Sequence, residues 1–302
     1  MKYEIKQLNL DSEDDSTVLN CSYYITEEDR VRSFSLEVDE TLIMEDVNAL
    51  LDNIDSDLIV TGFIHKYDPL FMKENFVSQM EQSQINYENG KLFFRDDVEI
   101  DEATSAVIYK QIMKNKTIDK TTVENFRKKV NENISPFVRE QLLTWIQYMG
   151  LVEGETLTIA PDGDLIGYKG LTKSPNDKMV SIHSGPGIVN GEKFQNARLE
   201  NEPGNIVEID RDIVDDDPAT GCSSGLHIGT FSYASRFADT DVVLCKFDPA
   251  DVVSVPVDCQ AQKVRVCKYE VIDKVNKPIK LGFLNQDEDI RGLISEDWKF
   301  FW

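Results

Sequence analysis

The segment 215–229, DDDPATGCSSGLHIG, constrains the fold of this chain more than any other stretch. Three acids lead into Pro218, and a run of small residues then reaches the apolar residues that flank His227. This pattern predicts a tightly turned polar loop that enters a buried strand. Three β-branched runs follow and predict strands at residues 242–247, 252–257 and 263–272. We therefore expect the C-terminal half of the chain to be built around a sheet.

The first 80 residues predict a small α+β unit. Strand patterns at residues 2–8, 18–26 and 30–38 are followed by a helical pattern at 42–51 and a compact apolar run at 58–65. An acidic loop is expected at residues 11–16 and a charged hairpin turn at 27–29. His65 is expected to end a strand rather than to bind a metal, because no cluster of ligands at metal spacing surrounds it.

A polar stretch at residues 78–86 marks the expected boundary between two units. Asn89-Gly90 then predicts a hairpin turn between short apolar segments. Helical patterns follow at residues 101–115, 123–130 and from Ser135-Pro136 to a C-cap at Gly150. Trp145 lies on the apolar stripe of the last of these helices and is expected in the core.

The period changes from helix to strand at residue 157. Residues 157–160 and 165–170 flank the turn sequence PDGD and predict a hairpin. The expected fold class is thus α+β. Its parts are an acidic unit at residues 1–80, a second unit at 87–273 and an aromatic tail at 274–302. The second unit combines helices at about 101–150 with a mixed or antiparallel sheet at about 157–273.

Four stretches of the second unit follow one another in a distinctive order: LTIAPDGDLIGYKGL, VEIDRDIVDDDPATGCSSGLHIGTFSYASRF, VVLCKFDPADVVSVPVD and KVRVCKYEVI. They place Gly, Pro, Cys and His at fixed spacings, which apolar periodicity alone does not reproduce. This order resembles the rIIB protein family of T-even bacteriophages, over about residues 87–273. The acidic start of the chain departs from that family, whose better-known members begin with a helix-turn-helix segment. A nucleic-acid role resting on that segment therefore does not carry over.

The resemblance implies a phage accessory protein in the host cytoplasm. The family is associated with countering host and prophage defences and with the timing of lysis, beside a larger rIIA partner, and has no established catalytic chemistry. We therefore expect the chain to act by binding, either to a host defence protein or to an rIIA-like phage partner, with a homo-oligomer as a further expected assembly. Neither catalytic residues nor a cofactor are expected.

Charge sharpens this expectation. The net charge is −23, and residues 1–60 hold 16 acids against 4 bases, so that segment carries 12 of the 23 excess negative charges. Direct nucleic-acid binding is disfavoured by this balance. The acidic surface either keeps the protein in solution, or mimics nucleic acid, or docks on a basic host protein. The candidate contact residues are Asp11, Glu13, Asp14, Asp15, Glu27, Glu28 and Asp29.

The tail ends in WKFFW and supplies two further interaction candidates, Trp298 and Trp302. Aromatic ends either dock into their own domain or anchor a partner, and docking is favoured because exposed aromatic clusters promote aggregation. No apolar run approaches the roughly 20 residues that span a bilayer, and the N-terminus has no apolar core of a signal peptide, so no membrane insertion is expected.

An enzymatic alternative comes from the stretch GLHIGTFSYASRFADTDVVLCKF, which is similar to the middle of ADP-ribosyltransferase-like folds. In that reading a helix turns Tyr233, Ala234 and Phe237 inward. The residues expected in a ligand pocket are Lys169, His227, Thr230 and Glu270, with Glu270 in the place of the catalytic glutamate. Lys169 stands where that chemistry needs Arg or His, which favours a silent relative that still binds a nucleotide-like ligand.

His227 also has a structural interpretation, in which it hydrogen-bonds the acidic loop 215–217. The five cysteines are an odd number spread over strand patterns, which is typical of reduced thiols. They lack the paired spacing of zinc knuckles, and the three acids lack the spacing of a calcium loop, so no metal site is expected.

Overall fold

The computed structural model describes residues 2–13, 16–38, 40–88, 91–95, 98–113, 117–152, 158–258, 262–279 and 281–297. The chain divides into two compact units, Met1–Gln79 and Met80–Trp302. Helices and antiparallel strands occur in both, which confirms the α+β class.

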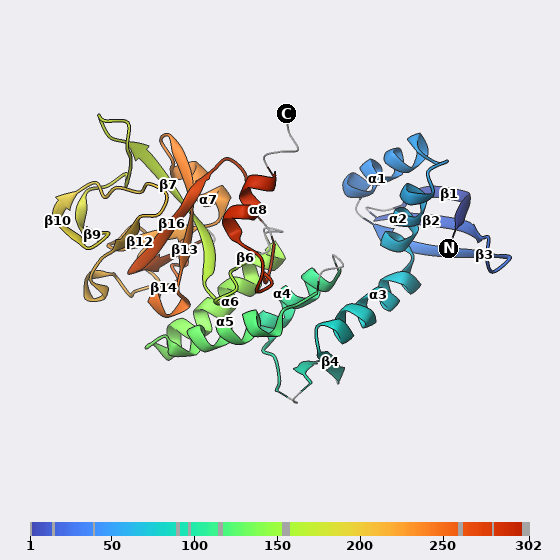
Figure 1. The fold of residues 1–302 in the computed structure, drawn as a ribbon, viewed down its shortest axis with the longest axis horizontal. Helices are drawn as coiled ribbons and strands as arrows, with labels where there is room; N and C mark the ends of the chain where they lie inside the picture. The colour runs from blue at the N-terminus through green and yellow to red at the C-terminus, as the bar shows by residue number, and fades with distance from the viewer. Residues whose placement is uncertain are drawn as a thin grey trace. The chain divides into compact units, whose positions relative to one another are not determined.

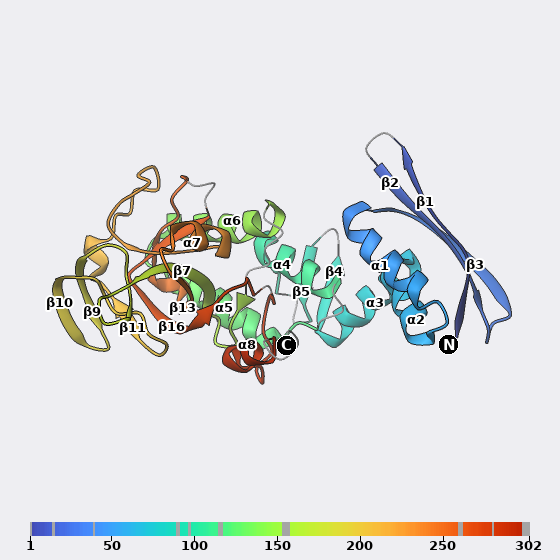
Figure 2. The ribbon, with the colours of Figure 1, turned by 90° about the horizontal axis from the view of Figure 1, so that it is seen from above.

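The first unit is a three-stranded antiparallel sheet with helices on one face (Figure 2). Its elements are β1 (Tyr3–Glu13), β2 (Ser16–Ile25), β3 (Arg30–Val38), α1 (Glu40–Asp52), α2 (Asp57–Tyr67) and the first part of α3 (Pro69–Gln82). Every second residue of β2 from Thr17 to Ile25 is buried, and these side chains meet Ile43, Val47 and Phe63 of the helices. The apolar residues whose alternation predicted the strands therefore lie on the face of the sheet that forms this core.

Two expectations for this unit were wrong. The apolar run 58–65 is helical rather than extended, because Val60, Phe63 and Ile64 have helical spacing and share a buried face in α2. The loop expected at 11–16 is shorter, since the β1–β2 ladder continues to the pair Glu13↔Ser16.

The polar stretch 78–86 is helical up to Gln82, so α3 runs across the division between the units. The hairpin after it consists of β4 (Ile85–Glu88) and β5 (Lys91–Phe94), paired at Glu88↔Lys91. Asn89 and Gly90 lie outside the described residues.

Three helices follow the hairpin and lie along one side of the large sheet (Figure 1). They are α4 (Glu102–Met113), α5 (Lys120–Glu132) and α6 (Pro136–Val152). Asp119 caps α5, and the Ser135 hydroxyl accepts a hydrogen bond from the Val138 amide at 3.3 Å at the start of α6. Trp145 is 2% exposed, as expected. Gly150 lies inside α6 rather than at its C-cap.

The large sheet has 11 strands in the order β10-β9-β11-β16-β13-β7-β12-β15-β14, with β6 and β8 paired to β7. The strands are β6 (Thr158–Ile159), β7 (Leu165–Lys173), β8 (Met179–Val180), β9 (Gly185–Val189), β10 (Glu192–Ala197), β11 (Ile206–Glu208), β12 (Leu226–Gly229), β13 (Asp241–Phe247), β14 (Val252–Ser254), β15 (Lys263–Val266) and β16 (Lys268–Val275). All ladders between these strands are antiparallel.

The run 263–272 is two strands rather than the single strand expected. The chain breaks at Cys267, whose amide bonds the Asp251 carbonyl at 3.1 Å instead of a ladder partner. As a result β15 pairs with β12 and β14, while β16 pairs with β11 and β13. The run 252–257 is also shorter than expected, because β14 ends at Ser254.

The C-terminal segment docks on the helices of its own unit. Gln111 of α4 exchanges two hydrogen bonds with the Phe283 backbone, at 2.7 and 2.8 Å, and the Thr122 hydroxyl of α5 donates to the Leu284 carbonyl at 2.7 Å. Helix α8 (Ile290–Asp297) then buries Ile290 and Ile294. Trp298 and Trp302 lie outside the described residues.

Candidate ligand pocket

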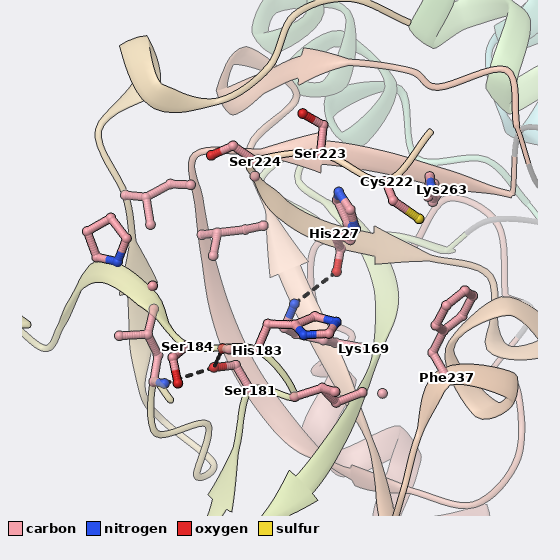
Figure 3. A pocket seen from close by; sticks show the side chains of 18 of the residues that line it. Lys169, Ser181, His183, Ser184, Cys222, Ser223, Ser224, His227, Phe237 and Lys263 are labelled. Atoms are coloured by element: carbon pink, nitrogen blue, oxygen red, sulfur yellow. Dashed lines mark hydrogen bonds between the residues drawn. The ribbon is translucent and has the colours of Figure 1, made fainter. Parts of the chain in front are cut away.

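A cavity of about 460 Å³ lies in the second unit, where β7 and β12 separate (Figure 3). The two strands pair only at Gly229↔Tyr168. Beyond that pair the ammonium of Lys169 donates a hydrogen bond to the main-chain carbonyl of His227 at 3.1 Å. The cavity is lined by Lys169, Gly170, Ser181, Ile182, His183, Ser184, Gly185, Pro186, Leu199, Ile209, Ile213, Cys222, Ser223, Ser224, Gly225, Leu226, His227, Tyr233, Phe237 and Lys263.

Helix α7 (Phe231–Phe237) forms one side of the pocket and packs closely on the sheet. A Cβ at position 170 would lie 2.4 Å from the carbonyl oxygen of Ala234, and one at position 229 would lie 2.6 Å from the ring of Tyr233. Glycine is therefore required at both positions for this approach. Tyr233 and Ala234 face inward as expected, but Phe237 is 49% exposed and lines the pocket.

The loop 215–225 forms the opposite wall, and Arg265 of β15 holds it. The Arg265 guanidinium, 0% exposed, donates to the carbonyls of Asp215 and Asp217 at 2.9 and 3.0 Å. It also donates to the carbonyl of Thr220 and, at 3.0 Å, to that of Gly221. The expectation that His227 ties this loop was therefore wrong: Arg265 reaches the loop carbonyls from the neighbouring strand.

Lys263 is 1% exposed and supports the same wall. Its ammonium donates to the Gly221 carbonyl at 3.0 Å and to the Asp258 carboxylate at 2.8 Å, and it lies 5.6 Å from the centre of the Tyr233 ring. Neither Lys263 nor Arg265 was expected at the site from the sequence. Their signal was the spacing KVR, because residues two apart on a strand share one face and both cations face the acidic loop.

His227 is neutral at physiological pH. Burial lowers the pKa of its imidazole to about 3, and the positive charges of Lys169, Lys263 and Arg265 act in the same direction. The ring atom Nε2 is buried and has no hydrogen-bond partner among the described residues.

Lys169 is the second unusual group. Burial lowers the pKa of its ammonium, and no described carboxylate lies within ion-pair distance of it. The ammonium lies 5.5 Å from the centre of the Tyr269 ring, which provides a weak cation–π contact. The pocket thus contains a buried amine without a carboxylate partner among the described residues.

The structure brings only two of the four expected pocket residues together. Lys169 and His227 line the cavity. Thr230 instead caps α7, because its hydroxyl accepts a hydrogen bond from the Tyr233 amide at 3.1 Å. Glu270 of β16 is absent from the lining residues and binds Arg291 at 3.1 Å. The grouping of Lys169 and Glu270 that the transferase alternative requires is therefore not assembled.

The acidic candidates of the first unit are exposed where they are described. They are Asp11, Glu27, Glu28 and Asp29. Glu27 accepts from the Lys2 amide at 2.9 Å, Glu28 pairs with Arg30, and Asp29 accepts from the Tyr24 hydroxyl at 2.6 Å. Asp14, Asp15 and the side chain of Glu13 lie outside the described residues.

Within the described ranges, no three His, Cys, Asp or Glu side chains are grouped to hold a metal ion. Cys21, Cys245 and Cys267 are buried free thiols, and Cys222 is an exposed one at the pocket. None of the described helices is both long and apolar enough to cross a membrane.

The fold and site define an α+β protein with a lysine-containing pocket in a large antiparallel sheet. The family model described as Bacteriophage T4 protein rIIB matches residues 71–282, more than half of the chain, and the chain belongs to this family. A relative, "Protein rIIB" of Enterobacteria phage T4, is 41% identical over 84 residues, an alignment that covers 27% of each chain. No solved structure matches the chain. The family match includes the pocket and leaves residues 1–70 outside.

Proposed function

We propose that this protein is a phage accessory factor that acts in the host cytoplasm, where it binds and neutralises or diverts a component of host defence. The first unit selects the partner in this proposal, and an rIIA-like phage protein or a second copy of the chain are the competing partners. The observation that carries the proposal is that residues 1–70 lie outside the family match and belong to a separate compact unit. The first unit can therefore differ in its partner while the family fold of the second unit stays the same.

The charge of the first unit supports a basic partner surface. Residues 1–60 carry 12 of the 23 excess negative charges of the chain. The described hairpin tip, residues 27–29, presents three exposed acids side by side. Complementary charge of this kind steers association and determines specificity more than affinity.

A pull-down from infected host lysate with the tagged full-length chain identifies the partner, and binding of that purified partner is then measured at low and high salt. We expect association to weaken as salt rises, because the Debye length falls from about 8 Å at physiological ionic strength to about 3 Å at 1 M. Binding that is independent of salt would contradict the acidic contact and favour the aromatic end of the chain. Recovery of an rIIA-like protein alone would contradict a host target.

We also propose that the chain is not an enzyme. The position of Glu270, bound to Arg291 and away from the pocket, supports this proposal against the transferase alternative. Purified protein incubated with NAD and host lysate is expected to transfer no label. Label transfer that disappears in Glu270→Gln would contradict the proposal.

A further inference from the structure

We propose that the cavity between β7 and β12 binds a phosphate monoester of about mononucleotide size, with Lys169 as its main charge contact. The proposal concerns the second unit and does not depend on the partner of the first.

The lining of the pocket lacks the acidic residues that dominate the chain. The whole sequence has 55 acids and 32 bases, yet none of the described residues that line the cavity is acidic. Two lysines and two of the three histidines of the chain are among them. A concave surface lined by one sign of charge concentrates ions of the opposite sign.

The two lysines differ in whether a carboxylate pairs with them. Lys263 is paired with Asp258 at 2.8 Å, so its charge is already balanced. Lys169 reaches only the carbonyl of His227 among the hydrogen-bond partners in the described structure. A buried ammonium without a counter-ion loses its proton more readily, and an anion bound at Lys169 would stabilise the charged form.

His227 points to the type of anion. Its neutral ring leaves Nε2 buried without a partner, and in the Nε2–H tautomer this atom is a hydrogen-bond donor. Ser224, exposed on the loop wall, adds a hydroxyl. Figure 3 shows Lys169 and His227 on neighbouring strands of the pocket, joined through the His227 carbonyl, and Ser224 on the loop wall with its hydroxyl pointing away from His227. A phosphate offers three terminal acceptor oxygens, whereas a carboxylate offers two, and a charged acceptor of this kind suits the Lys169 ammonium.

The remaining walls indicate an organic phosphate rather than the bare ion. Ile182, Leu199 and Leu226 supply aliphatic surface, and Phe237 at 49% exposure supplies an open aromatic face. A volume of about 460 Å³ lies within the usual range for sites that hold small organic ligands. Apolar walls with a few polar groups at one place are the usual composition of such sites.

The test is isothermal titration of the full-length protein with four probes: AMP, ribose 5-phosphate, inorganic phosphate and adenosine. We expect AMP to bind most tightly, inorganic phosphate at least about tenfold more weakly, and adenosine not measurably, because the charge contact supplies much of the affinity. Ribose 5-phosphate tests whether the base contributes to binding. If it binds as tightly as AMP, the site is assigned to sugar phosphates; if it binds more weakly, the site is assigned to nucleotides. If neither AMP nor ribose 5-phosphate binds at concentrations up to about 10 mM, any remaining affinity is too weak for a specific site. That result would overturn the proposal.

Lys169→Met removes the charge and keeps the length of the side chain, and it should weaken AMP binding at least about tenfold. The matched control is Lys178→Met, an exposed lysine of the same unit that pairs with Glu200 at 3.0 Å outside the pocket, and it should bind as the parent does. Ser224→Ala and Phe237→Ala change exposed pocket residues, so they keep the test open if Lys169→Met fails to fold. Unchanged AMP binding in all three pocket variants would place the ligand elsewhere and overturn the proposal.

Discussion

The buried guanidinium of Arg265 donates a hydrogen bond to the main-chain carbonyl of Asp215 at 2.9 Å. This bond joins the strand β15 to the acidic loop that forms one wall of the pocket. The loop is therefore joined to the sheet through its backbone, while the carboxylates of Asp215 and Asp217 accept hydrogen bonds within the loop, from the Asp217 and Ala219 amides at 2.9 Å.

Arg265→Met should destabilise the second unit by roughly 3 kcal/mol or more, because it leaves several loop carbonyls without their donor. Amide exchange should rise in residues 215–225. The measurement is denaturant unfolding combined with hydrogen exchange. Lys128→Met, at an exposed lysine of α5, is the control and should unfold like the parent. Parent-like stability of Arg265→Met would mean that the loop is held in another way.

The pH dependence of stability tests the state of His227. Its folded pKa of about 3 lies below the unfolded value of 6.5, so the unfolded chain binds the extra proton in that window. Stability should therefore be fully present above pH 6.5 and fall as the pH drops toward 3. Between pH 7 and 5 the parent should lose about 1–2 kcal/mol more than His227→Gln, which cannot titrate. Equal losses would show that folding does not lower the pKa of His227.

Tyr23 tests the independence of the two units. Its hydroxyl donates to Asp68 at 2.5 Å in the core of the first unit, so Tyr23→Phe should cost about 1–3 kcal/mol there. The unfolding transition of the second unit should not move. Tyr24→Phe is the matched control, since Tyr24 on the other face of β2 donates to the exposed Asp29, and no measurable change is expected. A shift of both transitions in Tyr23→Phe would show one cooperative unit.

Glu270 and Asp258 form ion pairs in different surroundings. Glu270→Gln breaks an exposed pair with Arg291 and should change stability by less than about 0.5 kcal/mol, because solvent screens such pairs. Asp258→Asn removes the carboxylate of the buried Lys263 and should cost about 2 kcal/mol or more. Thermal unfolding of both variants is the measurement. A large effect in Glu270→Gln would indicate a role for this residue that its contacts do not explain.

Neutral amides at the hairpin tip, Glu27→Gln, Glu28→Gln and Asp29→Asn, should slow association with the partner mainly through the on-rate. The fold should survive, because the tip acids are exposed. Surface plasmon resonance at two salt concentrations measures the effect. The matched control is the pair Asp52→Asn and Asp55→Asn, exposed acids of the same unit outside residues 27–29. An equal effect of the control would mean that net charge, and not the tip, steers association.

Local pattern predicted most of the elements. The alternation in β2, the hydroxyl of Ser135 before Pro136 and the turn sequence around Gly163 depend on neighbours in sequence, and the structure has them where expected. The rIIB resemblance was readable for the same reason, since it rests on residues at fixed spacing. The apolar run 58–65 was misread because a short run of this kind has no period that separates a strand from a helix.

Only the tertiary structure decided the site. The sequence determined that Lys263 and Arg265 share a strand face and that Asp215 begins an acidic loop, but a pairing across 50 residues depends on how β12, β14 and β15 order in the sheet. The break at Cys267, which splits one predicted strand into two, sets that order. The same order places Lys169 beside a strand with which β7 shares a single residue pair, and the space that opens there is the pocket. Contacts between residues distant in sequence are determined by packing of the whole sheet, which local propensity does not encode.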